Sequence, residues 1–439
     1  MTASRLREWL LKGLLLLIPI AYVPWADEPY RLFREELFQL AGAGVLLLWL
    51  YSRITGEKGG YLSAHGLKTD FSLFTCGAGA MLLSFALNGG SPSAVINTAL
   101  GGVLFLAFYN AIAPDTAFGW TKLFIFTAVF NGLLGIAQYT GYDPFFQSLD
   151  PVFHNVHRHY LVAGFMDSPN MLAPFLASFV PLAYAFFMHE TARGKNIAWT
   201  LRSVFLMTAI AFAQNLGALL ALGAVLGAML LYFTLRRPPD GGKTFTFKLA
   251  ASWTMALLVI AVAATGYARQ DDAIRLMKRY SMDERRMQNE ACVMMFQGAP
   301  LVGKGPGFFY AHFEEYRRAV WFNGPPLRLP DRPAHQAHNY YLQLLAEGGL
   351  LAAIPFFLLL LFWMRRHGAA LVRRERIPLP YPNAPLLLGA IGGFWVIALN
   401  GAGSFPFHIA PLAVTAIFWA AVAAVLMQPN SPDNKGTAS

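Results

Sequence analysis

Two histidines and an asparagine stand immediately before a long apolar run in PAHQAHNYYLQLLAEGGL, residues 333–350. His335 and His338 are three residues apart, so on a helix their side chains would share one face. An imidazole has a pKa near 6.5, which suits it to proton transfer near neutral pH. The pattern favours a general base or transition-state stabiliser at a membrane surface. The simpler alternative is a histidine that is hydrogen-bonded to a neighbour at the interface.

A metal site in this segment lacks a third ligand, because the two histidines alone are a weak zinc signal. Glu347 follows His338 by nine residues, which is about 13 Å along a helix and too far to share the same ion. We therefore expect no metal. Glu347 is expected either to support His338 or to bond a loop backbone near the interface.

A second group of side chains is basic and lies upstream of the histidines. Arg285 and Arg286 fall in a stretch with helical apolar spacing, and Lys304 lies in the turn sequence GKGPG. The planar fork of arginine binds phosphate oxygens through two parallel hydrogen bonds. The alternative is a solvated charged face whose arginines pair with neighbouring acids. Cations beside a poised histidine at a membrane are what a phosphate-bearing lipid would require.

The third segment is GFMDSPNMLAPF, residues 164–175. Pro169 suits the first turn of a helix, where no backbone donor is lost. Asn170 follows it and is expected either to cap the helix or to bind a ligand. The alternative is that the segment only begins a helix.

The elements that must position these residues are membrane helices. Of the 439 residues, 56% are hydrophobic and 13% are charged, whereas soluble domains have about a quarter charged residues. Apolar runs long enough to cross a bilayer recur along the chain. We predict an all-α integral membrane protein with about twelve transmembrane helices, at residues 8–25, 36–52, 71–88, 93–113, 120–140, 169–188, 197–214, 216–234, 248–267, 341–363, 384–402 and 408–427.

The distribution of basic residues predicts the orientation. The short connections 89–92, 215 and 403–407 carry no lysine or arginine, whereas basic residues crowd the intervening segments. This pattern is typical of a cytoplasmic N-terminus, and it accounts for much of the net charge of +10. The two spans that meet at Asn215 have the alternative of forming one long helix.

One long segment, 268–340, interrupts the membrane spans on the outer face. We predict helices at 271–297 and 308–321 within it, and a loop of this length is usually functional. The predicted organisation is residues 1–267 with nine membrane helices, 268–340 as a periplasmic loop that forms part of the active site, 341–427 with three more helices, and a disordered cytoplasmic tail at 428–439. The apolar anchors expected on the first loop helix are Ile274, Met277, Met282, Met287, Val293 and Phe296.

Three motifs together resemble the O-antigen ligase/polymerase superfamily of bacterial envelope glycosyltransferases, most closely the O-antigen ligases. They are GFMDSPN, then RRMQNEACVMMFQGAPLVGKGPGFF, then HQAHNYYLQLLAEGGL. In that family they look like a G-x-F-x-x-P-N helix entry, an arginine followed by P-L-x-G-x-G-x-G, and H-N-x-Y-L-x-x-L-x-E-x-G. Outside these motifs the match is only one of hydropathy.

The resemblance implies a glycosyltransferase in the bacterial inner membrane whose active site faces the periplasm. Such an enzyme moves a glycan from undecaprenyl pyrophosphate to a sugar hydroxyl of lipid A–core, with inversion and without a metal or cofactor. Its partners would be the lipid-linked donor, the lipid A–core acceptor and membrane lipids, with no nucleic acid.

The same resemblance implies roles for particular residues. His338 matches the essential histidine of the family, which is the proposed base. Arg285 matches the loop arginine, with Arg286 as the alternate, and Lys304 would help to hold the pyrophosphate. The supporting residues would be Asn339, His335, Glu347 and Asn170.

The chain departs from the family pattern at two arginines. A Ser-Arg-Gly at the start of a middle helix is replaced here, with Asn215 and Leu216 in that place. The arginine usually found just before the G-x-F motif is also absent, and Arg158, six residues before Gly164, is the candidate substitute. Alternative functions are an O-antigen or polysaccharide polymerase, a protein O-oligosaccharyltransferase and, from a different class, an anionic-lipid transporter.

Overall fold

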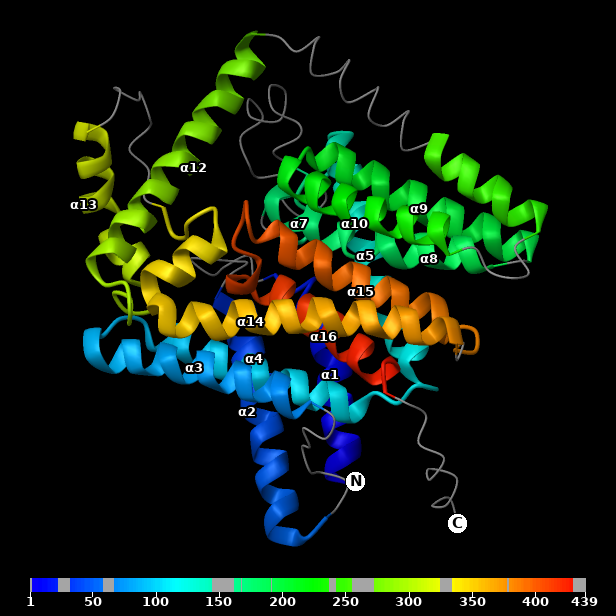
Figure 1. The fold of residues 1–439 in the computed structure, drawn as a ribbon, viewed down its shortest axis with the longest axis horizontal. Coiled ribbons are helices and arrows are strands. Elements are labelled where there is room, and N and C mark those ends of the chain that lie inside the picture. The colour runs from blue at the N-terminus through cyan, green and yellow to red at the C-terminus, as the bar shows by residue number, and fades with distance from the viewer. Residues whose placement is uncertain are drawn as a thin grey trace.

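The computed structural model describes most of the chain, and Figure 1 shows that the described part is helical. The described residues are 2–22, 32–57, 67–143, 162–166, 168–190, 192–236, 242–254, 272–323, 334–376 and 379–428. Fourteen α-helices are named below, and residues 243–254 are helical as well. The fold class predicted from composition is therefore confirmed at the level of an all-helical, multi-pass membrane protein.

The helices, in chain order, are α1 (Ala3–Leu17), α2 (Leu32–Thr55), α3 (Lys68–Asn88), α4 (Pro92–Ala111), α5 (Ala117–Tyr139), α7 (Pro169–Ala177), α8 (Val180–His189), α9 (Arg193–Ala213), α10 (Leu216–Leu235), α12 (Asp272–Gly298), α13 (Phe308–Asn323), α14 (Tyr340–Arg376), α15 (Asn383–Asn400) and α16 (Ala410–Leu426), with a 3-10 turn, η3, at Pro406–His408.

Nine helical stretches among the described residues are long and apolar enough to cross a membrane, and α16 is a shorter apolar helix. Helices satisfy their backbone hydrogen bonds internally, which is what a bilayer demands. The predicted span 8–25 overlaps the 15-residue α1, which begins earlier, at Ala3, and ends at Leu17. The span predicted at 248–267 lies mostly outside the described residues. The total of twelve spans therefore stays a prediction.

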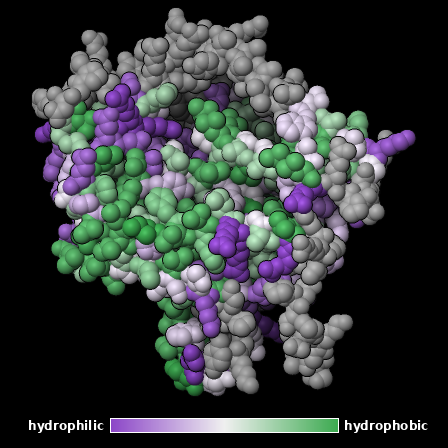
Figure 2. Space-filling model, in the orientation of Figure 1, coloured by the Kyte–Doolittle hydropathy of each residue, from purple (hydrophilic) through white to green (hydrophobic). Residues whose placement is uncertain are grey.

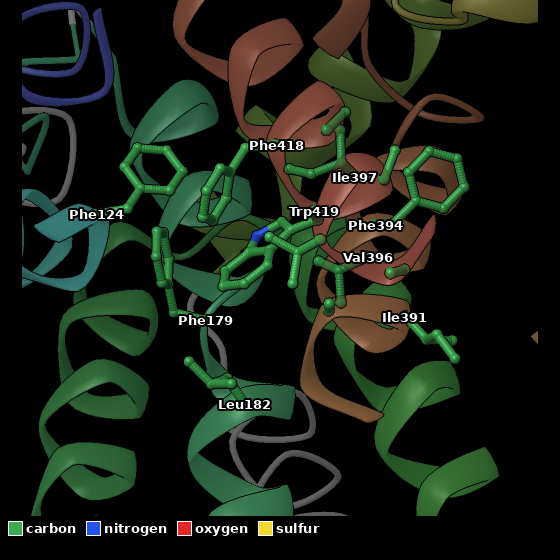
Figure 3. Packing of buried hydrophobic residues seen from close by; sticks show 14 of the residues in the cluster. Phe124, Phe179, Leu182, Ile391, Phe394, Val396, Ile397, Phe418 and Trp419 are labelled. Atoms are coloured by element: carbon green, nitrogen blue, oxygen red, sulfur yellow. The ribbon is translucent and has the colours of Figure 1, made fainter. Parts of the chain in front are cut away.

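The centre of the bundle is formed by α15, which packs against α8, α10 and α16. Aromatic side chains fill this centre, as Figure 3 shows around Trp419. The Trp419 ring lies 5.3 Å from that of Phe179 and 5.2 Å from that of Phe418, and its Nε1 donates to Ser178 Oγ at 3.2 Å. The contact with Phe179 is edge-to-face and that with Phe418 is tilted, and oriented aromatic contacts of this kind favour one packing arrangement.

The span predicted at 169–188 is two short helices, α7 and α8, rather than one. Pro181 lies in the first turn of α8 and has no N–H to donate to the carbonyl four residues earlier, so the helix is interrupted before it. The spans on either side of Asn215 are also separate helices. Gln214 has a left-handed φ of 50°, and Asn215 Oδ1 caps α10 by accepting from the Ala218 amide at 2.7 Å.

Helix α14 runs alongside α3 and joins the bundle to α12 and α13, which stand together at one end of the molecule (Figure 1). Figure 2 shows apolar side chains covering the middle of this face and hydrophilic side chains gathered towards α12. Both loop helices were predicted to within two residues. Two of the predicted anchors on α12 are wrong: Met282 is 69% exposed and Val293 is 39% exposed. The predicted anchor Met287 is confirmed as buried, and the buried face also includes Ala291, Cys292 and Met295.

Candidate active site

The candidate site is built at the start of α14, where the predicted histidine segment meets the connection between α15 and α16. Asn339 Oδ1 accepts from the amides of Tyr341 and Leu342, both at 3.1 Å, so Asn339 caps the helix. The amide of Tyr340 lies 2.9 Å from the carbonyl oxygens of both Gly401 and Ser404. The residues just before α14 are therefore fixed against the connection at 401–408.

His338 is half-buried in the angle between α12 and this connection. Its amide donates to Gln288 Oε1 of α12 at 3.2 Å, and its ring centroid lies 5.3 Å from that of Phe405. Burial, together with the neighbouring Arg285 cation, lowers the pKa of His338 to about 4. The imidazole is therefore neutral at pH 7 and able to accept a proton.

The two adjacent arginines of α12 have different surroundings. Arg285 is half-buried, its Nη1 donates to the Gly403 carbonyl at 3.4 Å, and its charge acts on His338. Burial lowers the pKa of the Arg285 guanidinium, which remains charged because its ordinary value is so high. The Arg286 side chain is 71% exposed and its Nε pairs with Glu290 Oε1 at 2.7 Å. Of the two, Arg285 is the one that the structure brings to His338.

The turn that follows α12 is held tightly against α14. Its Gly303 has a left-handed φ of 72°, and a Cβ at this position would lie 2.3 Å from the carbonyl oxygen of Glu347. Gly349 has a φ of 62° at a kink in α14 and approaches the Leu301 carbonyl in the same way. Only glycine combines this conformation with such close backbone contact. The glycines of the predicted P-L-x-G-x-G-x-G motif thus allow the turn after α12 to pack closely against the kink in α14.

Glu347 is buried beneath this turn, with 4% of its surface exposed. Its Oε1 accepts from Gln343 Nε2 at 3.0 Å and from the Phe309 amide at the start of α13 at 3.3 Å. A bond from Glu347 to backbone near the interface was one of the two roles expected from the sequence. Glu347 connects α14 to α13 and thereby positions the segment that begins with His338.

Of the remaining predicted cations, the structure describes Lys304, whose contacts lie elsewhere. The amide of Lys304 donates to the Ala346 carbonyl at 2.9 Å, and its Nζ lies 6.0 Å from the Phe308 ring centroid. None of these contacts reaches His338. Arg158 lies outside the described residues, so its predicted role stays a prediction.

A cavity of about 860 Å³ opens beside the candidate site, a volume in the range of ligand-binding pockets. At one end it is lined by Tyr310, His335, Gln336 and His408, which we call the cavity mouth. From there it follows α14 from Tyr340 to Trp363, about 34 Å at 1.5 Å per residue. Its walls are mainly apolar side chains of α3, α4, α14 and α16. Predicted site residue His335 therefore belongs to the cavity mouth.

The far end of the cavity contains an ion pair. Asp70 of α3 and Trp363 of α14 line this end, and Arg366 Nη1 pairs with Asp70 Oδ2 at 2.7 Å. Asp70 is 4% exposed, so this is a buried pair between α3 and α14.

The third predicted segment is anchored by residues far away in the sequence. Asn170 Oδ1 accepts from Asn215 Nδ2 at 2.6 Å, so Asn170 joins the starts of α7 and α10 and does not cap α7. Arg34 of α2 donates to the Ala21 carbonyl at 2.8 Å and also to the Phe165 carbonyl, 131 residues away. A cation therefore reaches the G-x-F motif from another helix, although the arginine that the family carries just before the motif is absent.

Sequence reasoning missed several residues around His338. Gln288 lies three positions after Arg285 on the same helical face, so helical spacing is a signal that would have found it. Phe405 and Gly403 belong to a short uncharged connection that carries no chemical signal. Arg34 could not be linked to residue 165 by any local pattern.

Among the described residues, no group of three or more histidine, cysteine, aspartate or glutamate side chains is placed to hold a metal ion. Comparison with models of known protein families found no match. A comparison with curated proteins found no match either.

Proposed function

We propose that the chain is a glycosyltransferase of the bacterial inner membrane that uses a lipid-linked glycan donor. The observation that carries this proposal is the pairing of a neutral, half-buried His338 with the Arg285 cation beside a cavity long enough for a hydrocarbon chain. A base, an anion-binding cation and a lipid-sized cavity are the parts that transfer from a lipid pyrophosphate requires. The proposed donor is a glycan on undecaprenyl pyrophosphate, and the proposed acceptor is a lipid A–core sugar on the periplasmic side of twelve membrane spans.

In the proposed reaction, neutral His338 accepts the proton of the acceptor hydroxyl. The hydroxyl oxygen attacks the anomeric carbon from the face opposite the phosphate, forming the new glycosidic bond with inversion. The bond from that carbon to the pyrophosphate oxygen breaks, and the leaving group keeps the electron pair. Arg285 stabilises the charge that develops on the pyrophosphate. One such donor is worth roughly 3–4 kcal/mol in the transition state.

The test is glycan transfer in a bacterial strain that lacks its own O-antigen ligase. Wild type should produce lipopolysaccharide with long glycan chains on a gel, and His338→Ala should produce none at equal expression. His312→Ala is the matched control, because His312 is a partly exposed histidine of α13 whose described contacts, with Glu315 and the Phe308 ring, lie within its own helix. Full transfer by His338→Ala would refute the assignment. Glycan polymer on the lipid carrier without ligated lipid A–core would instead favour the polymerase alternative.

The transporter alternative is favoured by one observation. The cavity extends along α14 and ends at the buried Asp70–Arg366 pair, and charges inside a membrane protein often mark a transport path. A transporter would move labelled lipid pyrophosphate between the leaflets of proteoliposomes without releasing the free carrier. A transferase would release undecaprenyl pyrophosphate only when acceptor is present.

A further inference from the structure

We propose that the cavity mouth, formed by Tyr310, His335, Gln336 and His408, binds an uncharged saccharide. This is the sugar that presents the acceptor hydroxyl to His338, so the inference rests on the proposed function and deepens it. The ligand class follows from the rings, the unused polar atoms and the charge of the mouth.

The rings of the mouth form an accessible aromatic surface. Tyr310 of α13 stacks on His335, with ring centroids 4.8 Å apart and an angle of 14° between the planes. Tyr310 remains 55% exposed, and both His335 and His408 are exposed. The apolar C–H face of a sugar ring packs against the negative face of an aromatic ring. A rigid tyrosine held by a second ring is well suited to that contact.

Polar atoms of the mouth are available for hydroxyl groups. Gln336 Oε1 is engaged by Gln343 Nε2 at 2.6 Å and by His408 Nδ1 at 2.7 Å, which fixes the amide. Among the described residues, no hydrogen bond uses Gln336 Nε2, the Tyr310 hydroxyl or the ring nitrogens of His335. Together these atoms offer both donors and acceptors, which is the mixture that a sugar hydroxyl recognises.

The charge of the cavity lining argues against an anionic ligand at the mouth. Among the described residues that line the cavity, Arg34 is the only lysine or arginine, and it donates to the carbonyls of Ala21 and Phe165. Three carboxylate residues, Glu35, Asp70 and Glu347, line the same cavity. The Arg285 cation is not among the residues that line the cavity. An uncharged ligand suits this surface.

The mouth is also close to the proposed base. Gln336 precedes His338 by two residues, and Phe405 both lines the cavity and packs against the His338 ring. A sugar held on Tyr310 and Gln336 would therefore lie next to His338. The acceptor hydroxyl would reach His338 from the mouth, while the leaving pyrophosphate would be held by Arg285, which does not line the cavity.

The test is saturation-transfer difference NMR on the full chain, purified in a detergent without a sugar headgroup, with maltotriose and chitotriose as neutral probes. Wild type and Tyr310→Phe, which keeps the ring, should give signals on the sugar ring protons. Tyr310→Ala should weaken binding about three- to tenfold. Tyr142→Ala is the matched control, since Tyr142 is an equally accessible tyrosine, 61% exposed, at the end of α5.

The inference is overturned if wild type gives no signal with either probe, if Tyr310→Ala binds as wild type does, or if a phosphorylated probe binds more tightly than its neutral form. In a transfer assay, Tyr310→Ala should raise KM for the acceptor and leave KM for the lipid-linked donor unchanged. Saccharide binding without any transfer would refute the proposed function and leave the saccharide site standing. Transfer without Tyr310-dependent binding would refute the saccharide site and leave the proposed function standing.

Discussion

At the scale of single residues, His338 and Arg285 influence each other through charge. A histidine beside a carboxylate is usually held in the protonated state, whereas the half-buried guanidinium here opposes protonation. The consequence is an imidazole that is neutral at pH 7. The same cation is available to a phosphate, so binding of an anionic substrate would partly neutralise it and make His338 more basic.

The first prediction concerns the pH dependence of transfer. Because the pKa of His338 is lowered to about 4, the neutral base should persist from pH 7 downwards, and the rate should fall only as pH approaches 4. Arg285→Gln removes the cation that disfavours protonation, so the acid limb of the pH–rate profile should move to higher pH. The rate at pH 7 should also fall about 10²- to 10³-fold through loss of a leaving-group donor.

Arg286→Gln is the control for this profile. Arg286 is adjacent in sequence and carries the same charge, but its side chain is 71% exposed and pairs with Glu290, and exposed pairs contribute little. Its pH–rate profile should overlay that of wild type. An unchanged profile for Arg285→Gln would show that the cation does not act on His338.

The sequence predicted the chemistry of these residues but not the choice between the two arginines. Their types and spacing indicated a cation near a histidine, and helical geometry requires adjacent side chains to point in different directions. Which one faces His338 depends on the rotation of α12. The rotation of α12 about its axis is set by the packing of Met287, Ala291 and Met295, which are buried. The predicted anchors Met282 and Val293 would have buried a different face of α12.

At the scale of elements, the turn between α12 and α13 depends on glycine. The second prediction is that Gly303→Ala lowers the melting temperature and the transfer activity together, because its Cβ would collide with the Glu347 backbone. Gly56→Ala has the same kind of left-handed φ, 74°, with nothing within 4 Å of the added Cβ. Gly56→Ala should lower the free energy of unfolding only through backbone strain, by about 1–2 kcal/mol.

Thermal unfolding of both variants in detergent checks this prediction. A larger shift for Gly303→Ala than for Gly56→Ala is expected, and equal shifts would mean that the close contact adds nothing. Helix positions such as 308–321 were predictable because hydropathy and Gly/Pro turns mark them locally. The break in α14 at Gly349 was not, because it exists only where the turn at Leu301–Gly303 presses against it.

At the scale of the whole molecule, the cavity arises from helices that are distant in sequence. Its walls come from α2, α3, α4, α14 and α16, so no single segment carries its signature. Composition predicted the membrane helices, but the pairing of α14 with α3 and of α16 with α4 is a property of tertiary packing. The cavity and the position of Arg34 therefore lay beyond sequence reasoning.

The third prediction is that Ala413→Trp, on the wall formed by α16, blocks the lipid substrate. Ala413 lines the cavity, and an indole there would occupy space needed by a hydrocarbon chain. Transfer should fall at least about tenfold, and less polyprenyl lipid should co-purify by mass spectrometry. Leu220→Trp, at a 64% exposed position on α10, is the control. Equal lipid recovery from both variants would place the substrate chain outside this cavity.

The turn at 298–307 has one further consequence for how the protein can move. Its backbone is bonded at once to α14, through Gly305 to Glu347 and Leu350 to Pro300, and to the junction of α3 and α4, through Ser91 to Pro306. The turn therefore links α14 to the junction of α3 and α4. The wall made by α3 and α14 cannot separate from α12 without breaking these hydrogen bonds. We therefore expect a long chain to enter or leave the cavity along the helices that this turn does not bond, such as α2 and α16, which also line it.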